Sequence, residues 1–385
     1  MRIAHIGSKG IPSRGGTERV VEALAVRQAL RHDVTVYGSS RVTSRRTHGG
    51  ARVIALPTAG GKYLGPLGLQ LVCAVHALLR GKYDVVHLHG SENAFLLPLL
   101  QLRYPVVLTS HGPAYSRAKW SSAAKAVMRA FEGWSVRLPE VPTAVAENQA
   151  QLLEAQHGHR VVHVPNGVDE IGAANAAAAR QVLDDVGLDA GEYWLFAAAR
   201  VDPTKGCHTL IEAYRQFTSP PPLVVLGDLY HAPGYEERLR ALAQGLTIHF
   251  VPRVDDRAVV LGLVQEASLF IFPSEVEAMS MMLLETLAVG TLAVASDIPE
   301  NTSVLPEWYP LFRSGDSASL RERLEQVWGL EQPVRRSLAQ EARRWIEARF
   351  RWEDIAAEYE RLYRDAIATR QSRSRRLRPF ASIRA

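Results

Sequence analysis

Cysteine and long apolar runs are both scarce in this chain. Among its 385 residues the only cysteines are Cys73 and Cys207. They lie far apart and outside any C-x-x-C pair, so neither a disulfide framework nor a zinc ribbon is expected. No apolar run approaches the ~18 residues that a membrane-spanning helix requires, and residues 1–6 are too short for the apolar part of a signal peptide. We therefore expect a cytoplasmic protein.

Metal-ligand motifs are missing as well. The thirteen histidines include no H-E-x-x-H motif. His87 and His89 stand two apart on an expected strand and so face the same side, but a metal centre needs a third ligand that the sequence does not identify. No Asp-x-Asp motif stands in a metal-binding context, because the two Asp-Asp pairs are typical of helix starts or of the surface. We expect no bound metal and no resident cofactor.

A basic surface is also absent from the body of the chain. The formal net charge is +5, but residues 370–385 contain six Arg and no acid, and removing these six charges leaves −1 for the rest. A nucleic-acid partner is therefore not expected. Two interpretations of the basic end stay open: a disordered, solubilising tail, or a segment that docks on an anionic membrane surface with Phe380 and Ile383 as apolar contacts.

Short runs rich in Val and Ile recur along the sequence. Most are continuous rather than alternating, which is typical of strands buried on both faces of a parallel sheet. Helix-length amphipathic stretches separate them, for example 17–30, 207–217, 256–267 and 281–289. Strands that alternate with helices indicate βαβ units. We predict an α/β protein built from doubly wound parallel sheets.

The chain is too long for one ordinary core, which favours two domains. The alternation restarts after about residue 165, where strand signals are missing for nearly thirty residues. We predict an N-terminal domain at 1–168 and a second domain at 169–350. A C-terminal helix at 351–369 is expected to cross back to the first domain, and a basic tail follows at 370–385.

Glycines follow the first strand, but neither common nucleotide motif is complete there. Gly16 stands where a P-loop needs Lys, which disfavours an ATPase. Gly7, Gly10, Gly15 and Gly16 do not form G-x-G-x-x-G either, so the sequence does not predict a dinucleotide site. The glycines need another explanation.

Charged residues follow two strands of the second half. In open parallel sheets, ligands bind outside the carboxyl ends of the strands. Arg200 and Lys205 precede a helix and suit phosphate or diphosphate, whereas Glu277 and Glu285 suit vicinal hydroxyl groups. Singly, each residue is more often a salt bridge, a turn or a solvated face. Together they suggest a nucleotide sugar.

Several motifs occur in an order that matches a known family. They are GGTE at 15–18, TSHG at 109–112, VPNGVD at 164–169, ARVDPTKG at 199–206, VVLGD at 224–228, FPSEVEAMSMMLLETLAVGTLAVASD at 272–297 and FRWEDIAAEYERLY at 350–363. Through these motifs the chain resembles the retaining glycosyltransferases of family 4 over nearly its whole length. The resemblance implies a GT-B fold, in which two Rossmann-like domains face each other across a cleft.

The resemblance also assigns roles to residues. It implies that Arg200 and Lys205 bind the donor diphosphate, that Glu285 holds the donor ribose, and that Glu277 contacts hydroxyls of the transferred sugar. His111 would border the reaction centre, where its main chain stabilises positive charge at the anomeric carbon. The remaining positions implied for the donor are Gly15, Gly16, Asn166, Gly227, Asp228, Ser280 and Met281.

The sequence departs from the family pattern beside Glu277. Ala278 and Ser280 stand where the family commonly has glycines, so extra side chains narrow the space for the sugar. Met279, Met281 and Met282 are typical of packing rather than of substrate contact.

The resulting hypothesis is a retaining, metal-independent glycosyltransferase in surface polysaccharide or glycoconjugate synthesis, peripheral on the inner face of the cell membrane. It would move a sugar from a nucleoside-diphosphate sugar to a hydroxyl of a glycan or lipid-linked acceptor. The N-terminal domain would bind the acceptor, with Tyr63, Tyr115 and Trp120 as candidate stacking residues. Two alternatives stay open: a nucleotide-sugar epimerase or hydrolase on the same fold, and a non-catalytic sugar-nucleotide-binding scaffold.

Overall fold

The protein is described here by a computed structural model, which divides into two compact units. Unit 1 comprises Met1–Asn166 with Trp352–Ala385, and unit 2 comprises Gly167–Arg351. The described residues are 1–12, 15–43, 45–58, 64–113, 122–169, 175–230 and 233–376. The unit boundaries lie within two residues of those predicted between the two domains and before the C-terminal helix.

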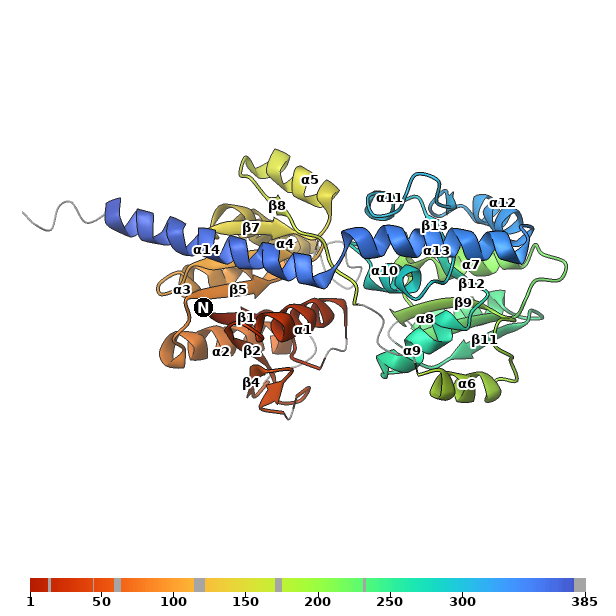
Figure 1. Ribbon diagram of the computed structural model, residues 1–385, viewed down its shortest axis with the longest axis horizontal. Coiled ribbons are helices and arrows are strands. Elements are labelled where there is room, and N and C mark those ends of the chain that lie inside the picture. The colour runs from red at the N-terminus through yellow and green to blue at the C-terminus, as the bar shows by residue number, and fades with distance from the viewer. Residues whose placement is uncertain are drawn as a thin grey trace, which may run out of the picture. The chain divides into compact units, whose positions relative to one another are not determined.

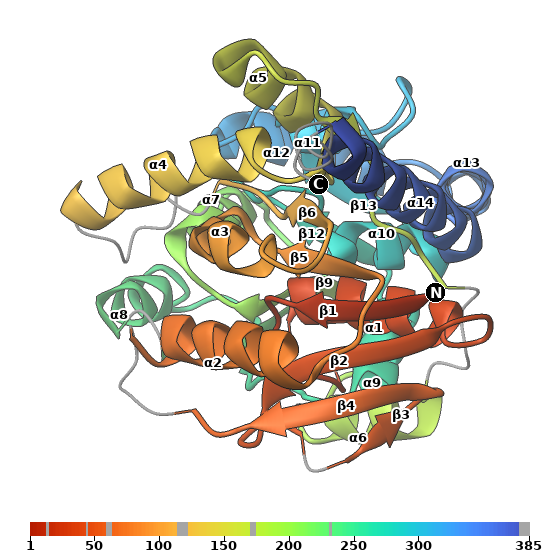
Figure 2. The ribbon, with the colours of Figure 1, turned by 90° about the vertical axis from the view of Figure 1, so that its left-hand side faces the viewer.

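Unit 1 holds a sheet in the order β3-β4-β2-β1-β5-β6-β7-β8 (Figures 1 and 2). The strands are β1 Arg2–Ile6, β2 Asp33–Ser39, β3 Thr47–His48, β4 Ala51–Leu56, β5 Val85–His89, β6 Val106–Ser110, β7 Val141–Ala144 and β8 Val162–His163. Neighbouring strands are parallel apart from the β3–β4 pair. The helices are α1 Gly16–Gln28, α2 Leu64–Arg80, η1 Ser91–Leu96, α3 Leu97–Leu100, α4 Ser122–Arg137, α5 Glu147–His157 and α14 Trp352–Arg376.

Unit 2 holds an all-parallel sheet in the order β11-β10-β9-β12-β13-β14. Its strands are β9 Trp194–Arg200, β10 Leu223–Asp228, β11 Ile248–Val251, β12 Leu269–Phe272, β13 Ala293–Ser296 and β14 Leu311–Phe312. Its helices are α6 Ala176–Asp184, η3 Pro203–Lys205, α7 Cys207–Tyr214, α8 Pro233–Leu242, α9 Arg257–Gln265, α10 Met281–Ala288, α11 Pro299–Thr302, α12 Ser317–Trp328 and α13 Gln332–Arg349.

Each sheet contains one point where the strand order reverses. In unit 1 the chain proceeds outward from β1 to β2 and β4, then returns to the other side at β5. In unit 2 it proceeds from β9 to β10 and β11, then returns at β12. Loops that leave the sheet in opposite directions open a crevice at such a point, which is where ligands bind in doubly wound sheets. Ligand sites are therefore expected at the carboxyl ends of β1, β5, β9 and β12.

The two faces of the unit 1 sheet differ in character. One face places Ala4, Ile6 and Leu88 in an apolar cluster with residues of α2 and α3, such as Cys73 and Leu97. Alternate residues on the same strands point to the other face and include buried histidines of β1 and β5. Helices α1 and α14 contact each other and cover that second face, along which α14 lies in Figure 1.

The C-terminal helix is longer than predicted. Helix α14 continues to Arg376, seven residues beyond the predicted end at 369, so the first part of the expected tail is helical. The reason lies in Arg370, which pairs with Glu140 at 3.6 Å and donates to the carbonyl of Gln101. These contacts hold the helix against unit 1 past the predicted boundary. The interpretation of the tail as disordered is therefore wrong for 370–376, and residues 377–385 lie outside the described residues.

None of the helices in the described part of the chain combines the length and the apolar character that crossing a bilayer would require.

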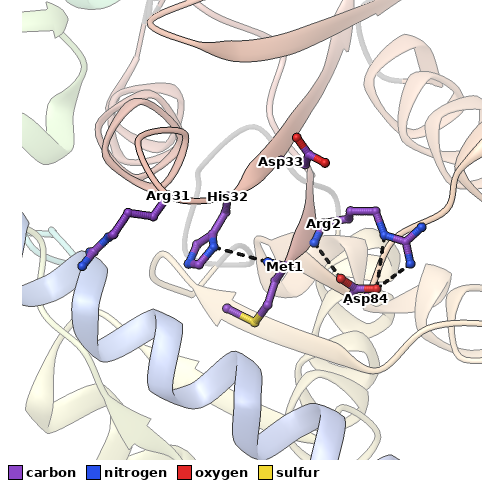
Figure 3. A pocket seen from close by; sticks show the side chains of 6 residues that line it. All are labelled: Met1, Arg2, Arg31, His32, Asp33 and Asp84. Atoms are coloured by element: carbon purple, nitrogen blue, oxygen red, sulfur yellow. Dashed lines mark hydrogen bonds and ion pairs between the residues drawn. The ribbon is translucent and has the colours of Figure 1, made fainter.

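A pocket on unit 1 lies beside the amino ends of β1 and β2 (Figure 3). Its lining residues are Met1, Arg2, Arg31, His32, Asp33 and Asp84. These residues belong to the amino ends of β1 and β2, to the turn before β2 and to the residue before β5. Arg2 donates to Asp84 at 2.7 Å across it. Since ligands of doubly wound sheets bind at the opposite, carboxyl edge, we assign this pocket no role.

Candidate active site

Two loops of unit 2 meet at the reversal point between β9 and β12. The first ends in Gly206, whose φ of +66° and close packing both demand glycine: a Cβ there would lie 2.0 Å from the carbonyl oxygen of Pro273. The backbone N–H of Glu275 also donates to the carbonyl of Thr204 at 2.8 Å. The loop that carries Lys205 is thereby fixed against the loop after β12.

This packing brings together two of the predicted site residues. The Nζ atom of Lys205 lies 2.6 Å from Oε1 of Glu277, and the two side chains are 25% and 12% exposed. A charge-assisted hydrogen bond of this length is among the stronger polar contacts in proteins. The predicted phosphate-binding cation and the predicted sugar-binding carboxylate are therefore direct partners.

Glu285 is the most buried carboxylate of the site. It lies in α10, its residue exposure is 3%, and its Oε1 accepts a hydrogen bond of 2.9 Å from Arg257. Arg257 also donates to Asp169 at 3.0 Å. Burial lowers the pKa of Arg257, but the ion pairs with Glu285 and Asp169 outweigh it and leave that pKa raised. The guanidinium therefore keeps its charge and compensates the buried carboxylate.

Sequence reasoning missed Arg257. It is the first residue of α9, directly after the capping residue Asp256. A cation in the first turn of a helix is unfavourable in the helix dipole, so its position there was a usable signal. The prediction that Asp256 begins a helix is confirmed, because its carboxylate accepts from the N–H of Ala258 at 2.8 Å.

Arg200, Gly227 and Asp228 lie together at the ends of β9 and β10. Arg200 is exposed at the last position of β9. Asp228 on β10 is its backbone partner in the strand pairing, after a register shift between Gly227 and Asp228. Gly227 has a φ of +151°, and a Cβ there would lie 2.0 Å from the carbonyl oxygen of Ala198. Glycine is thus required for this irregularity, which sets the position of Asp228 beside Arg200.

The start of α10 is built by packing and capping. Ser280 is the N-cap residue, and its hydroxyl accepts from the N–H of Leu283 at 3.4 Å. Met279 and Met281 are each 6% exposed, as expected of packing residues. The side chains of Ser280 and Met281 therefore serve the helix in this structure, and their predicted donor contacts stay a prediction.

The remaining predicted donor residues belong to unit 1. Asn166 is buried at the end of that unit. Gly15 caps α1 in an extended conformation that any residue adopts, and a Cβ on Gly16 would meet nothing within 4 Å. The fold itself therefore does not require glycine at position 16. The implied approach of a ligand to bare backbone at this helix N-terminus stays a prediction.

His111 follows β6 and contacts a buried histidine cluster. Its Nε2 lies 3.1 Å from Nδ1 of His89. His5, His87 and His89 have ring nitrogens within 4.8 Å of one another, so the structure adds to His87 and His89 the third histidine that the sequence did not identify. The signal was a histidine within the apolar first strand, in register with His87 on β5.

Burial governs the charge of this cluster. It lowers the pKa of His5 to about 4 and the pKa values of His87 and His89 well below their usual range. Neutral imidazoles are the form that binds metals. Both ring nitrogens of each of these three residues are already engaged in hydrogen bonds to protein groups, and we assign no metal to them.

The predicted acceptor-side residues Tyr63, Tyr115 and Trp120 lie outside the described residues.

Comparison with known proteins finds a family model that matches each unit. The model of "Glycosyltransferase Family 4" matches residues 14–170, and that of "Glycosyl transferases group 1" matches residues 181–345. A phosphatidyl-myo-inositol mannosyltransferase of Mycobacterium leprae is 29% identical over 323 residues, which cover 79% of this chain and 80% of the relative. A GDP-mannose:cellobiosyl-diphosphopolyprenol alpha-mannosyltransferase of Komagataeibacter xylinus is 21% identical over 385 residues, 95% of this chain and 94% of the relative.

Solved structures agree on the fold. Sucrose-phosphate synthase from Thermosynechococcus elongatus aligns with a TM-score of 0.78 at 20% identity, covering 95% of this chain and 99% of that one. HepE of Anabaena in complex with UDP-glucose aligns with a TM-score of 0.74 at 18% identity, covering 94% and 99%. The predicted GT-B class of fold is confirmed.

Proposed function

Since this chain belongs to the family 4 glycosyltransferases, we propose that it transfers a sugar from a nucleoside diphosphate to an acceptor hydroxyl with retention of the anomeric configuration. The family predicted from the motifs is confirmed, and with it glycosyltransferase activity. The donor class, the stereochemistry and the roles of individual residues form the proposal.

The contact between Lys205 and Glu277 carries this proposal. Lys205 has three N–H donors, so it can keep its 2.6 Å bond to Glu277 while it donates to phosphate oxygens. Glu277 has further lone pairs for hydroxyls of the sugar. One ion pair at the reversal point of the sheet therefore offers a cation to the diphosphate and an anion to the sugar, as a sugar nucleotide requires.

Charge development explains why cations are needed. When the bond between the anomeric carbon and the phosphate oxygen breaks, negative charge grows on the diphosphate. Lys205 and Arg200 offset this charge, and fixed donors in a pre-organised site do so without reorganisation. These two side chains supply the stabilisation that a metal ion gives in other sugar transferases, so we propose a metal-independent reaction.

The substitution proceeds on one face of the sugar. The acceptor oxygen forms its bond to the anomeric carbon on the face from which the diphosphate departs, through an oxocarbenium-like transition state. The proton of the acceptor hydroxyl passes to the departing phosphate oxygen, so no enzymic base is needed. Glu277 acts as a sugar contact, and Glu285, held by Arg257, accepts from the ribose hydroxyls.

The acceptor is proposed from the relatives. One of them is named for phosphatidyl-myo-inositol and another for a cellobiosyl-diphosphopolyprenol. We propose a glycan or lipid-linked acceptor, bound by unit 1, in glycoconjugate or polysaccharide synthesis on the cytoplasmic face of the membrane. Arg373, Arg375 and Arg376, near the end of α14, would approach an anionic lipid surface.

A vesicle assay tests this membrane contact. The protein should sediment with phosphatidylglycerol vesicles and not with phosphatidylcholine vesicles, and the R373Q/R375Q/R376Q variant should lose the difference. Equal sedimentation of the variant and the wild type would refute the role of these arginines.

A donor screen tests the proposed donor class. The melting temperature is measured with UDP-, GDP-, dTDP- and ADP-sugars and with the corresponding nucleoside diphosphates, for the wild type and for Lys205→Ala. We expect the nucleotides of one base to raise the wild-type melting temperature, and the variant to lose most of that rise.

A turnover assay then tests the reaction. The donor found in the screen is incubated with membrane lipid extract, and release of nucleoside diphosphate should depend on the extract. Release without an acceptor would favour a hydrolase, and binding without any turnover would favour a scaffold.

A further inference from the structure

A row of imidazoles crosses the reversal point of the unit 1 sheet. Nε2 of His5 lies 2.9 Å from Oε1 of Gln28 on α1, and Nδ1 of His5 lies 3.0 Å from Nε2 of His89. Nδ1 of His89 lies 3.1 Å from Nε2 of His111. His5 and His89 are fully buried, and successive rings stack at interplanar angles of 21° and 19°. The row thus runs from a helix amide, through the interior, to a residue at the carboxyl edge of the sheet.

With the amide of Gln28 oriented as in this structure, neutral rings leave the row one consistent arrangement of protons. A neutral imidazole carries one N–H and one lone pair, and burial keeps His5 and His89 neutral by lowering their pKa values. The carbonyl oxygen of Gln28 can only accept, so His5 donates to it from Nε2. Nδ1 of His5 must then accept from Nε2–H of His89, whose Nδ1 in turn accepts from Nε2–H of His111.

The orientation of the Gln28 side-chain amide sets which nitrogen of each ring in the row carries the proton. Its Nε2 donates to the hydroxyl of Tyr363 on α14 at 3.1 Å, and that hydroxyl donates to Nδ1 of His87 at 2.8 Å. His87 then donates from Nε2 to the hydroxyl of Thr109 at 2.7 Å. Turning the amide round would require every proton in both branches to move. Helix α14 therefore helps to set the proton positions at the far end of the row.

The same geometry disfavours a metal among these rings. A metal ion would need one lone pair from each of His5, His87 and His89. The lone pairs of His5 and His89 instead accept the N–H of the next ring in the row. The two nitrogens of His87 are taken by Tyr363 and Thr109.

We propose that Gln28, His5 and His89 are positioning residues that hold His111 in the Nε2–H tautomer. The inference rests on the proposed function, with His111 at the border of the reaction centre as the family resemblance implies. The partner of Nε2 is a neutral imidazole and not a carboxylate, so the row places no charged group behind His111. That suits a reaction in which positive charge grows on the sugar, because a positive charge nearby would oppose it.

Tautomers are measured directly by NMR. Protein labelled with [15N]histidine gives two-bond 1H–15N correlation spectra that separate Nε2–H from Nδ1–H rings, and His111→Gln assigns the signal of His111. The wild type should show His111 with protonated Nε2 and unprotonated Nδ1. A wild-type His111 with protonated Nδ1 would overturn the proposal. So would stoichiometric zinc in the purified protein that is lost in His5→Asn. Neither result depends on activity, so the tautomer is tested even if the proposed reaction is wrong.

Two substitutions of His89 form a matched pair. Asn places its carbonyl oxygen near the position of Nδ1 and so still accepts from His111, whereas Leu leaves no acceptor. His89→Asn should retain the single tautomer and a kcat within about threefold of the wild type. His89→Leu should show mixed tautomers and a kcat about tenfold or more lower, the scale of a misplaced contact, while the donor-induced rise in melting temperature stays.

His87→Asn separates positioning from stability. This histidine lies in the same buried patch, with its ring centre 3.9 Å from that of His89, but outside the row. Asn keeps an acceptor for Tyr363 and loses the bond to Thr109. The variant should melt at a lower temperature and keep the His111 tautomer and kcat, assayed well below that temperature. If kcat falls in His87→Asn as far as in His89→Leu, the row acts only through stability and the proposal fails.

Discussion

Lys205 and Glu277 are separated by 72 positions in the sequence, yet their charged atoms lie 2.6 Å apart at the carboxyl ends of two adjacent strands. The contact exists because Gly206 admits the carbonyl of Pro273 and because the N–H of Glu275 bonds to Thr204. The two loops are therefore fixed against each other around this pair.

Breaking this pair should reduce turnover. Lys205→Ala removes the cation that offsets the departing diphosphate, and Glu277→Gln removes the charge that orients both Lys205 and the sugar. We expect each to lower kcat roughly 10²-fold or more, the scale of losing one transition-state contact. Because the residues act together, the double variant should lose less than the product of the two single effects.

Arg238→Ala is the matched control for that prediction. Arg238 and Glu212 form an exposed ion pair of 3.2 Å in the same unit, outside the site. The kcat of the Arg238→Ala variant should equal that of the wild type. A kcat within threefold of the wild type for Lys205→Ala or Glu277→Gln would contradict the assigned roles.

Arg257 should affect donor binding more than the chemical step. Arg257→Ala leaves the buried carboxylate of Glu285 without its cation. We expect unit 2 to lose about 1–3 kcal/mol in free energy of unfolding, below the usual cost for a buried pair because the Arg257 side chain is 35% exposed. The KM for donor should rise about tenfold with a smaller change in kcat, measured by urea titration and steady-state kinetics. Unchanged KM and stability would show that the contact has no role.

A substitution at Gly16 should change turnover without lowering the melting temperature. Gly16→Ala adds a methyl group where the fold has open space, and Ala is the better helix former. The melting temperature should stay or rise, while turnover falls at least tenfold if a ligand approaches this backbone. Gly206→Ala is the contrasting variant, since its methyl group would meet the Pro273 carbonyl and lower the melting temperature. Wild-type turnover in Gly16→Ala would refute the proposed use of bare backbone.

The sequence predicted the parts of the site that follow from strand order. Continuous apolar runs marked β9 and β12, and the rule for parallel sheets then placed Lys205 and Glu277 at one edge. Those steps need only local pattern and topology, which a single sequence contains.

Partners set by tertiary packing were not predictable in the same way. The bonds from Arg257 to Glu285 and Asp169 depend on how α9 packs against α10 and on side-chain rotamers. The imidazole row depends on the register of β1 and β5 and on the docking of α14. The end of α14 was misjudged because its last turns are held by distant partners, Glu140 and Gln101, rather than by an apolar periodicity.

Acid should destabilise unit 1 through its buried histidines. Burial lowers the pKa of His5 from 6.5 to about 4, so below pH 6.5 the unfolded chain binds a proton that the folded chain does not. Stability is therefore complete above pH 6.5 and falls as the pH drops toward 4. His5 alone should cost about 2 kcal/mol at pH 5, at about 1.4 kcal/mol per unit of pKa.

Hydrogen exchange resolved by peptide checks this prediction. Protection in β1 and β5 should fall between pH 7 and pH 5, after correction for the intrinsic exchange rate, by more than protection in β9 and β12. In His5→Gln the pH dependence of unit 1 should be weaker. Equal loss in both units, or no change in the variant, would contradict the assignment of the effect to His5.

The stereochemistry of the product tests the central claim most directly. The donor found in the screen, of known anomeric configuration, is incubated with enzyme, acceptor and EDTA, and proton NMR follows the anomeric signal of the first product formed. The account predicts a product with the configuration of the donor, formed at the same rate with and without the chelator. A product of inverted configuration would contradict it, and so would loss of transfer in EDTA.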